Sequence, residues 1–191
     1  MINIVIKKAE VQNLAALLEN NAKKLKKELA TAVNATAKFT QSQMAKAIAL
    51  ELNVSQKDIK QGIIGKRATK DVPETTVILK KGFRYKLKRF KPVQNKAGVR
   101  VKISRRRGSI VVPHAFMGPK PGQTAPKLNG HVFKREGKAR KPIHILKGAS
   151  PWGAFTKNNH LLPTVKQTEE RLTYEINRRI RFIELKAAGK I

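Results

Sequence analysis

The fold is decided by a stretch without Pro or Gly, Val11–Leu52, which reads VQNLAALLENNAKKLKKELATAVNATAKFTQSQMAKAIALEL. Apolar residues recur there at the steps of four and seven that one face of a helix requires. They are Leu14, Leu18, Leu25, Leu29, Val33, Ala37, Met44 and Ile48. The stretch therefore predicts a helical arm over residues 11–52. Polar residues around Asn34 leave two interpretations open, one long helix or two consecutive ones.

At 1.5 Å per residue, a helix over the whole arm would be about 60 Å long. A helix of that length is too long for a compact domain of 191 residues. We therefore expect the arm to protrude or to pack against a neighbouring subunit.

A short second helix and several strands are predicted after the arm. Ser55-Gln56-Lys57-Asp58 resembles a capping box, and the helix it begins would end near Gly62 or Gly65. Period-two alternation or β-branched runs predict strands. These strands are expected at residues 2–6, 75–79, 99–103, 110–112 and 131–133.

The last third of the chain returns to helical periodicity. Pro and Gly are concentrated between Gly118 and Gly130, which predicts a loop. Apolar residues at helical spacing from Val165 to Ile183 then predict a C-terminal helix over 163–187. Runs of strands between terminal helices indicate an α+β fold. We expect a single domain over 1–191 with a mainly antiparallel sheet region at 75–147.

The composition is strongly basic. There are 42 Lys and Arg against 12 Asp and Glu, which gives a net charge of +30 and a sequence pI of about 11.0. Such a charge indicates a polyanion or an acidic partner. Hydrophobic residues make up 40%, so the chain is not a disordered basic tail. The short apolar start predicts no signal peptide, and no apolar stretch is long enough to predict a membrane span.

The charge is concentrated between Thr75 and Arg135, where 17 Lys and Arg occur with no Asp or Glu. Cations at spacings that follow a phosphate backbone are typical of sequence-independent nucleic-acid contact. A solvated surface, or a face for an acidic protein, is the alternative. The candidate contact residues are Lys80, Lys81, Arg84, Lys86, Lys88, Arg89, Lys91, Arg100, Lys102, Arg105, Arg106 and Arg107.

Two local patterns refine this prediction. On a strand, Arg100 and Lys102 would point away from Val99 and Val101, and the triplet 105–107 before Gly108 would form a hairpin tip. Base-stacking modules place aromatic residues beside such cations. Phe83, Tyr85 and Phe90 do lie in the first cluster, but we expect them in the core.

Enzyme signatures are missing from the sequence. There is no Cys, no phosphate-binding glycine motif and no nucleophile elbow. Glu169-Glu170 lies in the first turns of the last helix, where it favours the helix dipole. His114, His131, His144 and His160 are not at metal-ligand spacing. We expect no catalytic site, metal, cofactor or small-molecule substrate, and an enzyme acting on polyanions is the least favoured interpretation.

Three pieces in fixed order resemble a known family. The first two are Ala32–Ala37 and Leu52–Ile59, and the most specific is the series from Gly130 to Ser150. This chain is similar there to the tail-completion, or minor tail protein Z, family of tailed bacteriophages. The family's Val-Phe-x-Arg, Arg-x-Pro-Ile and Gly-Pro-Ser patterns fall on Phe133, Arg135, Arg140, Pro142, Ile143, Gly148 and Ser150, with Ala149 in place of the proline.

From the residues alone, the same series predicts a strand, a turn and a second strand, with Phe133 and Ile143 facing the core and Arg135 and Arg140 facing outward. The resemblance implies a structural virion protein at the head-proximal end of the tail, present in host cytoplasm during assembly. It also implies a homo-oligomeric ring, with a hexamer expected, that contacts other tail or neck proteins and double-stranded DNA. The alternative is a cellular RNA- or DNA-binding protein of the ribosome- or nucleoid-associated type.

Overall fold

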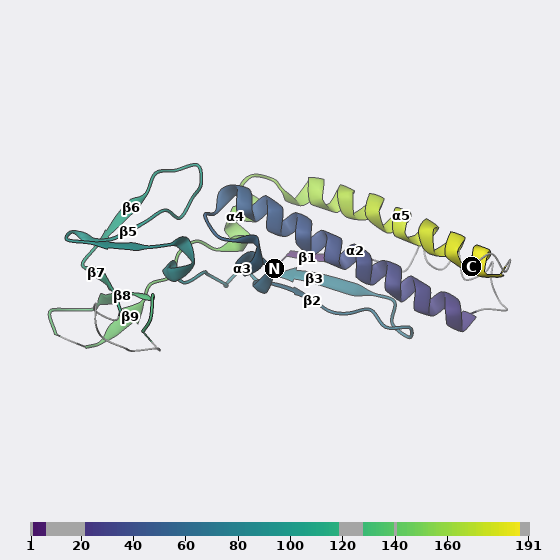
Figure 1. Ribbon diagram of the computed structural model, residues 1–191, viewed down its shortest axis with the longest axis horizontal. Coiled ribbons are helices and arrows are strands. Elements are labelled where there is room, and N and C mark those ends of the chain that lie inside the picture. The colour runs from purple at the N-terminus through teal and green to yellow at the C-terminus, as the bar shows by residue number, and fades with distance from the viewer. Residues whose placement is uncertain (1, 7–21, 119–127, 140, 188–191) are drawn as a thin grey trace. The chain divides into compact units, whose positions relative to one another are not determined.

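The computed structural model describes residues 2–6, 22–118, 128–139 and 141–187 (Figure 1). Contacts divide the chain into two units. The first unit comprises Met1–Ala45, Ile63–Leu79 and Asn159–Ile191, and the second unit comprises Lys46–Gly62 and Lys80–Asn158. The prediction of one domain over 1–191 stays a prediction.

Two long helices form most of the first unit. Helix α2 spans Ala22–Glu51 without a break at Asn34, so the described part of the arm is one long helix, and helix α5 spans Leu161–Ala187. Residues 11–21 of the predicted arm, with Leu14 and Leu18, lie outside the described residues. Further along the predicted stripe, Leu25, Leu29, Val33 and Met44 are buried.

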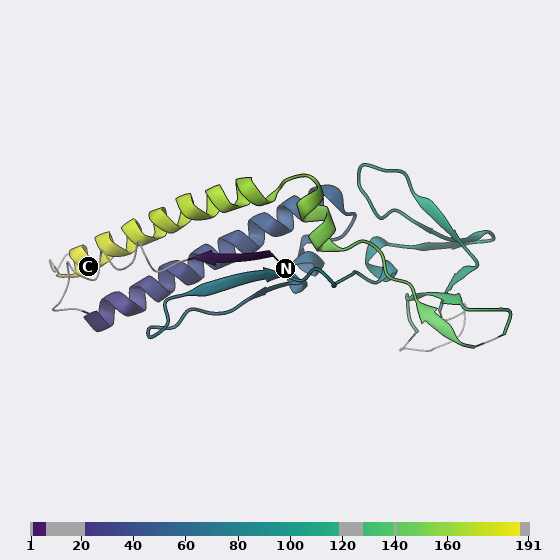
Figure 2. The same ribbon diagram turned by 180° about the vertical axis from the view of Figure 1, so that it is seen from behind.

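Polar contacts fix the antiparallel alignment of α2 and α5, which lie side by side in Figures 1 and 2. Arg179 donates to Glu28 at 3.1 Å, and the hydroxyls of Thr40 and Thr168 are 2.9 Å apart in the buried interface. An apolar core joins the facing sides of both helices. It includes Leu25, Leu29, Ala32, Val33, Leu172 and Ile176.

A three-stranded antiparallel sheet completes the first unit. Its order is β1 (Ile2–Ile6), β3 (Thr75–Leu79) and β2 (Ile63–Gly65). Asn34 of α2 anchors the segment between β2 and β3, because its side-chain amide both donates to and accepts from the backbone of Ala68 at 2.9 Å. The polar residue that weakened the helical pattern therefore serves a tertiary contact.

The second unit contains two further antiparallel sheets of three strands. One has the order β4 (Val93–Asn95), β5 (Gly98–Val101) and β6 (Ile110–Pro113). The other has the order β7 (Ala115–Met117), β8 (Val132–Arg135) and β9 (Ile143–Ile145). The second unit also contains three short helices, which are α3 (Gln56–Gln61), the 3-10 helix η2 (Leu87–Phe90) and α4 (Pro151–Lys157).

The α+β prediction and the antiparallel pairing are confirmed. The five predicted strands correspond to β1, β3, β5, β6 and β8. The bounds of β1 and β3 match the prediction, and those of the other three differ by at most two residues. Where the sequence indicated one sheet region, the described strands form three sheets. The sequence does not predict strands β2, β4 and β7, which have three residues each and are too short for a period to show, nor the short helices η2 and α4. Strand β9 is the second strand that the series from Gly130 to Ser150 predicts. Residues 119–127 of the predicted loop lie outside the described residues.

The start of α3 follows the predicted capping box. The backbone amide of Asp58 donates to the Ser55 hydroxyl at 3.2 Å, which satisfies one amide of the first turn. The Ser55 hydroxyl in turn donates to the Asp58 carboxylate at 2.8 Å. The carboxylate thus reaches back to the hydroxyl of the N-cap residue.

Gly98 is required at the start of β5. Its φ is +140°, and a Cβ there would lie 2.2 Å from the carbonyl oxygen of Val112 on the paired strand β6. Any other residue would force the two strands apart. Glycine therefore fixes the pairing that presents Arg100.

We expect Leu29→Ala to lower the free energy of unfolding by about 2–5 kcal/mol, because Leu29 is 4% exposed in the α2–α5 core. Leu50→Ala is the matched control on the same helix, since Leu50 is 62% exposed, and it should change stability by at most about 0.5 kcal/mol. Urea denaturation followed by circular dichroism measures both. Equal losses would contradict the described core.

Candidate nucleic-acid interface

The twelve predicted cations are all exposed and all belong to the second unit, and together they are called the basic surface here. They lie before, within and after η2, on β5, and in the connection from β5 to β6. The second unit has 25 Lys and Arg against 3 Asp and Glu, a net charge of +22, whereas the first unit has 17 against 9, a net charge of +8. The charge excess is therefore a property of the second unit.

Each acidic residue of the second unit already contacts a basic side chain. Asp58 pairs with Arg89, Glu51 pairs with Arg106 at 2.9 Å, and the Glu136 carboxylate lies 3.2 Å from the ring of His144. The carboxylates thus neutralise particular cations and leave the rest of the basic surface without an acidic counterpart in the same unit.

Strand β5 has the two-sided character that its sequence predicts. Val99 and Val101 are buried, and Arg100 between them is exposed, as is Lys102 beyond the strand end. Alternation of side chains along the strand therefore separates an apolar face from a cationic one.

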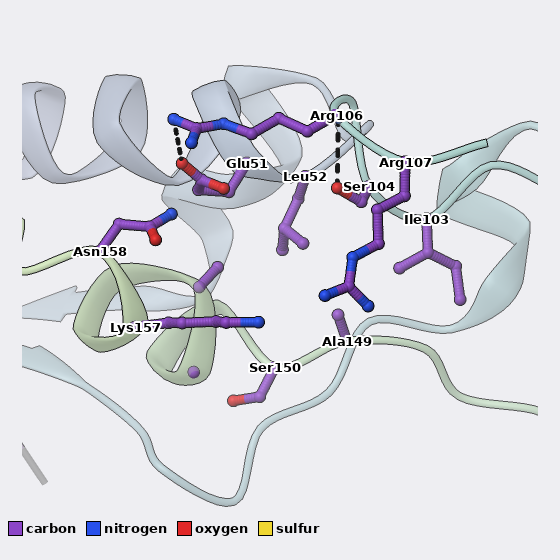
Figure 3. Close-up of a pocket in the computed structure, with 12 residues that line it drawn as sticks. Glu51, Leu52, Ile103, Ser104, Arg106, Arg107, Ala149, Ser150, Lys157 and Asn158 are labelled. Atoms are coloured by element: carbon purple, nitrogen blue, oxygen red, sulfur yellow. Dashed lines mark hydrogen bonds and ion pairs between the residues drawn. The ribbon is translucent and has the colours of Figure 1, made fainter.

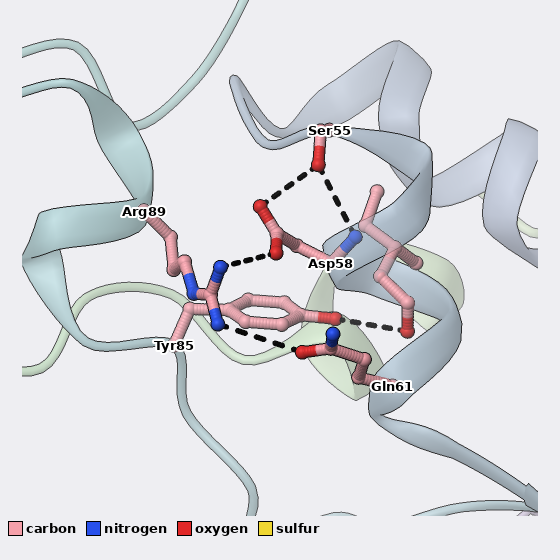
Figure 4. A network of polar contacts seen from close by, with 6 residues as sticks. Ser55, Asp58, Gln61, Tyr85 and Arg89 are labelled. Carbon is pink, nitrogen blue, oxygen red and sulfur yellow. Dashed lines mark hydrogen bonds and ion pairs between the residues drawn. The ribbon is translucent and has the colours of Figure 1, made fainter.

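The aromatic residues near η2 belong mainly to the core. Tyr85 and Phe90 are buried, and Phe83 is 37% exposed with its ring edge-on to Tyr85. Burial, followed by the charge of Asp58, raises the pKa of the Tyr85 hydroxyl, which donates to the carbonyl of Ile59 at 3.4 Å (Figure 4). These rings do not form the exposed stacking platform that single-stranded nucleic acid would need.

Part of the basic surface has a structural role. Arg89 donates to both Asp58 and Gln61 of α3, as Figure 4 shows. The backbone amide of Arg105 donates to the Glu51 carbonyl at 2.9 Å, and its side chain donates to the Leu52 carbonyl at 3.3 Å.

These contacts cap the C-terminus of α2. The last turn of α2 has no basic residue of its own, so its exposed carbonyls and the Glu51 carboxylate meet cations from the β5–β6 connection instead. Arg105 and Arg106 therefore differ from Arg107, which takes no part in this cap. The triplet does lie in the turn between two paired strands, but two of its three members hold that turn to α2.

An open pocket of about 530 Å³ lies beside this cap (Figure 3). The turn residues Arg106 and Arg107 line one side, and Lys157 and Asn158 at the end of α4 line another. Sequence reasoning missed Lys157, because it lies 50 residues beyond the triplet and shows no cluster of its own.

A second pocket, of about 450 Å³, adjoins η2 and is lined by Arg84, Lys86, Lys88 and His131 among others. Partial burial, then the charges of Lys86 and Lys88, lower the pKa of the His131 imidazole. Lys86 and Lys88 are therefore close enough to the ring to disfavour its charged form.

The residues of the family pattern have mainly structural positions. Phe133 is buried on β8 and Ile143 is half-buried on β9, whose antiparallel pairing confirms the predicted strand, turn and strand. A Cβ on Gly148 would lie 2.7 Å from the ring of Phe90, and Ser150 is the N-cap residue of α4. Arg135 and Pro142 are exposed, while Arg140 lies outside the described residues.

Two features are absent from the part of the chain that the structure describes. None of its helices is long and apolar enough to cross a membrane. No group of three or more His, Cys, Asp or Glu residues there could hold a metal ion.

Comparisons of this chain with protein-family models, with curated proteins and with solved structures give no match.

We expect the pKa of His131 to lie below about 6.5 and to rise in Lys86→Ala, because that variant removes a cation facing the ring. Lys102→Ala removes the same charge outside this pocket and should leave the value unchanged. Because the pKa of His131 is lower in the folded protein than in the unfolded chain, the unfolded chain binds the proton first. The folded state therefore loses stability as the pH falls below about 6.5. NMR titration of the imidazole measures the shift, and an unaltered pKa in Lys86→Ala would contradict it.

Proposed function

We propose that this chain is a structural protein of a phage virion, of the tail-completion type, and that its second unit contacts the backbone of duplex DNA through the basic surface. The observation that most strongly supports DNA contact is the net charge of +22 in a unit whose three carboxylates already contact basic side chains. Phosphate groups are the commonest counterpart for such an excess.

Contact with the phosphate backbone of DNA depends mainly on exposed cationic side chains. Lys and Arg side chains replace condensed counterions on DNA, and the release of those ions drives binding without regard to sequence. The exposed face of β5 and the segment around η2 supply such cations, and the nearby aromatic residues are largely buried. Duplex DNA therefore suits this surface better than single strands that need stacking.

The place in the virion is supported by the family resemblance alone. The three pieces of similarity occur in order from residue 32 to residue 150. A tail-end protein of that kind would form a ring around the DNA conduit. DNA enclosed in the ring, with acidic neighbours in the tail or neck, would offset repulsion between basic copies.

The first test is a charge-removal variant, Arg84→Ala/Arg100→Ala/Lys102→Ala. All three side chains are exposed, and none belongs to the cap on α2. If each neutralises one phosphate, the slope of log affinity against log salt should flatten by roughly 2.7. Fluorescence anisotropy with a labelled duplex across a salt series gives the slope.

The matched control removes three exposed cations from the first unit, Lys24→Ala/Lys26→Ala/Lys27→Ala. It makes the same change in net charge and should leave the slope near that of the unchanged protein. If both triple variants behave alike, the second unit is not the DNA-contacting part. An unaltered slope with failed tail joining would instead assign the basic surface to an acidic protein partner.

The second test concerns assembly. We expect a homo-oligomeric ring, with six copies as the expected number from the symmetry of phage tails. Size-exclusion chromatography with light scattering, with and without duplex DNA, measures the mass against 21.4 kDa for one chain. A protein that binds nucleic acid and stays monomeric under both conditions would favour the cellular nucleic-acid-binding alternative.

A further inference from the structure

We propose that Arg107 and Lys157 form one subsite for a backbone phosphate of duplex DNA, in the open pocket between the β5–β6 connection and helix α4. The inference rests on the proposed function and adds to it a particular pocket, a cation that the sequence did not indicate, and the group that is bound there. All residues involved belong to the second unit.

The two cations enter the pocket from different walls. In Figure 3 the guanidinium of Arg107 extends from the turn above and the ammonium of Lys157 extends from the end of α4, both toward the pocket interior. Arg107 and Lys157 are 50 residues apart in the sequence, and the fold brings them to the same pocket. Two like charges facing one space repel each other, and an anion between them would convert that repulsion into attraction.

The local carboxylate does not supply that anion. Among the described residues that line the pocket, Glu51 is the acidic one, and Arg106 pairs with it at 2.9 Å. Its side chain is only 12% exposed. Of the three cations that line the pocket, Arg106 is paired with Glu51, and no second carboxylate lines the pocket for Arg107 and Lys157.

Small residues in the wall of the pocket allow a ligand to approach the backbone of α4 closely. Ala149, Gly153 and Ala154 line it with little side-chain volume. Glycine within a helix is unfavourable relative to alanine, and a Cβ on Gly153 would meet nothing within 4 Å. The packing of the protein therefore does not require glycine there, whereas a ligand lying against α4 would benefit from it.

Neutral polar groups complete the lining. Ser150 and Asn158 border the same space, and the Ser104 hydroxyl accepts from the backbone amide of Arg106 at 3.2 Å. Arginine binds phosphate through two parallel hydrogen bonds, and lysine binds it as a point charge. The Ser150 hydroxyl donates to the Lys81 carbonyl at 3.3 Å, so the donors beside the two cations are the Ser104 hydroxyl and the Asn158 amide. One arginine and one lysine with such donors are the chemistry that recognises a phosphodiester group.

The experiment compares Arg107→Ala, Lys157→Ala and the double variant, all in the full chain. Lys60→Ala is the matched control, because Lys60 also lies in the last turn of a short helix of the same unit but does not line this pocket. Duplex affinity is measured by anisotropy across a salt series, and circular dichroism checks that each variant folds. Lys157→Gln, which keeps much of the side chain, repeats the test should Lys157→Ala unfold.

Each single variant should lose about tenfold in affinity at low salt, the effect of one charge-assisted contact. Because both side chains bind one phosphate, the double variant should lose less than the product of the two single losses. Its salt slope should flatten by about 0.9, as expected for one phosphate. Lys60→Ala should remain close to the unchanged protein.

The contradicting outcomes separate this inference from the proposed function. If the unchanged protein binds duplex DNA but Lys157→Ala matches Lys60→Ala, or if the single losses multiply, the shared subsite is wrong while DNA contact stands. If the unchanged protein shows no salt-dependent duplex binding, the proposed function itself fails. A titration with inorganic phosphate completes the test: phosphate binding lost in Lys157→Ala with DNA affinity intact would assign the pocket to a free anion and overturn the backbone subsite.

Discussion

The imbalance of charge in the second unit constrains everything else about it. With 25 cations and 3 carboxylates, the unit cannot neutralise itself through internal ion pairs. Two of its three carboxylates form ion pairs at the ends of helices. Asp58 pairs with Arg89 at the start of α3, and Glu51 pairs with Arg106 at the end of α2. The remaining exposed cations repel one another, so binding a polyanion would stabilise the folded unit as well as serve a function.

The first unit is stabilised mainly by apolar packing. Its two long helices are held by an apolar core, and polar contacts at Glu28–Arg179 and Thr40–Thr168 define how they align. Each of these two hydroxyls also hydrogen-bonds a carbonyl of its own helix, Thr40 that of Thr36 and Thr168 that of Thr164. The contact between the hydroxyls therefore links the two helices without leaving either group dependent on it. The helix pair forms most of the first unit, whose net charge of +8 is smaller than the +22 of the second unit.

Local patterns were predictable from the sequence, and contacts between distant residues were not. The alternation around Arg100, the capping of α3 by Ser55 and the apolar face of α2 each depend on residues a few positions apart, and each is confirmed. The cap that Arg105 provides for α2 joins residues more than 50 positions apart, and no sequence period reveals it. The same holds for Lys157, which becomes notable only once the fold places it in a pocket with Arg107.

Contact between the second unit of the chain and duplex DNA is the proposal on which the others depend. Hydrogen–deuterium exchange of the full chain, with and without duplex DNA at low salt, tests it directly because it locates contact along the backbone. We expect slower exchange in residues 80–91 and 98–113 when DNA is present, with the exchange of α5 in the first unit unchanged. Protection confined to the first unit, or no protection in either segment of the second unit while DNA is bound, would contradict it.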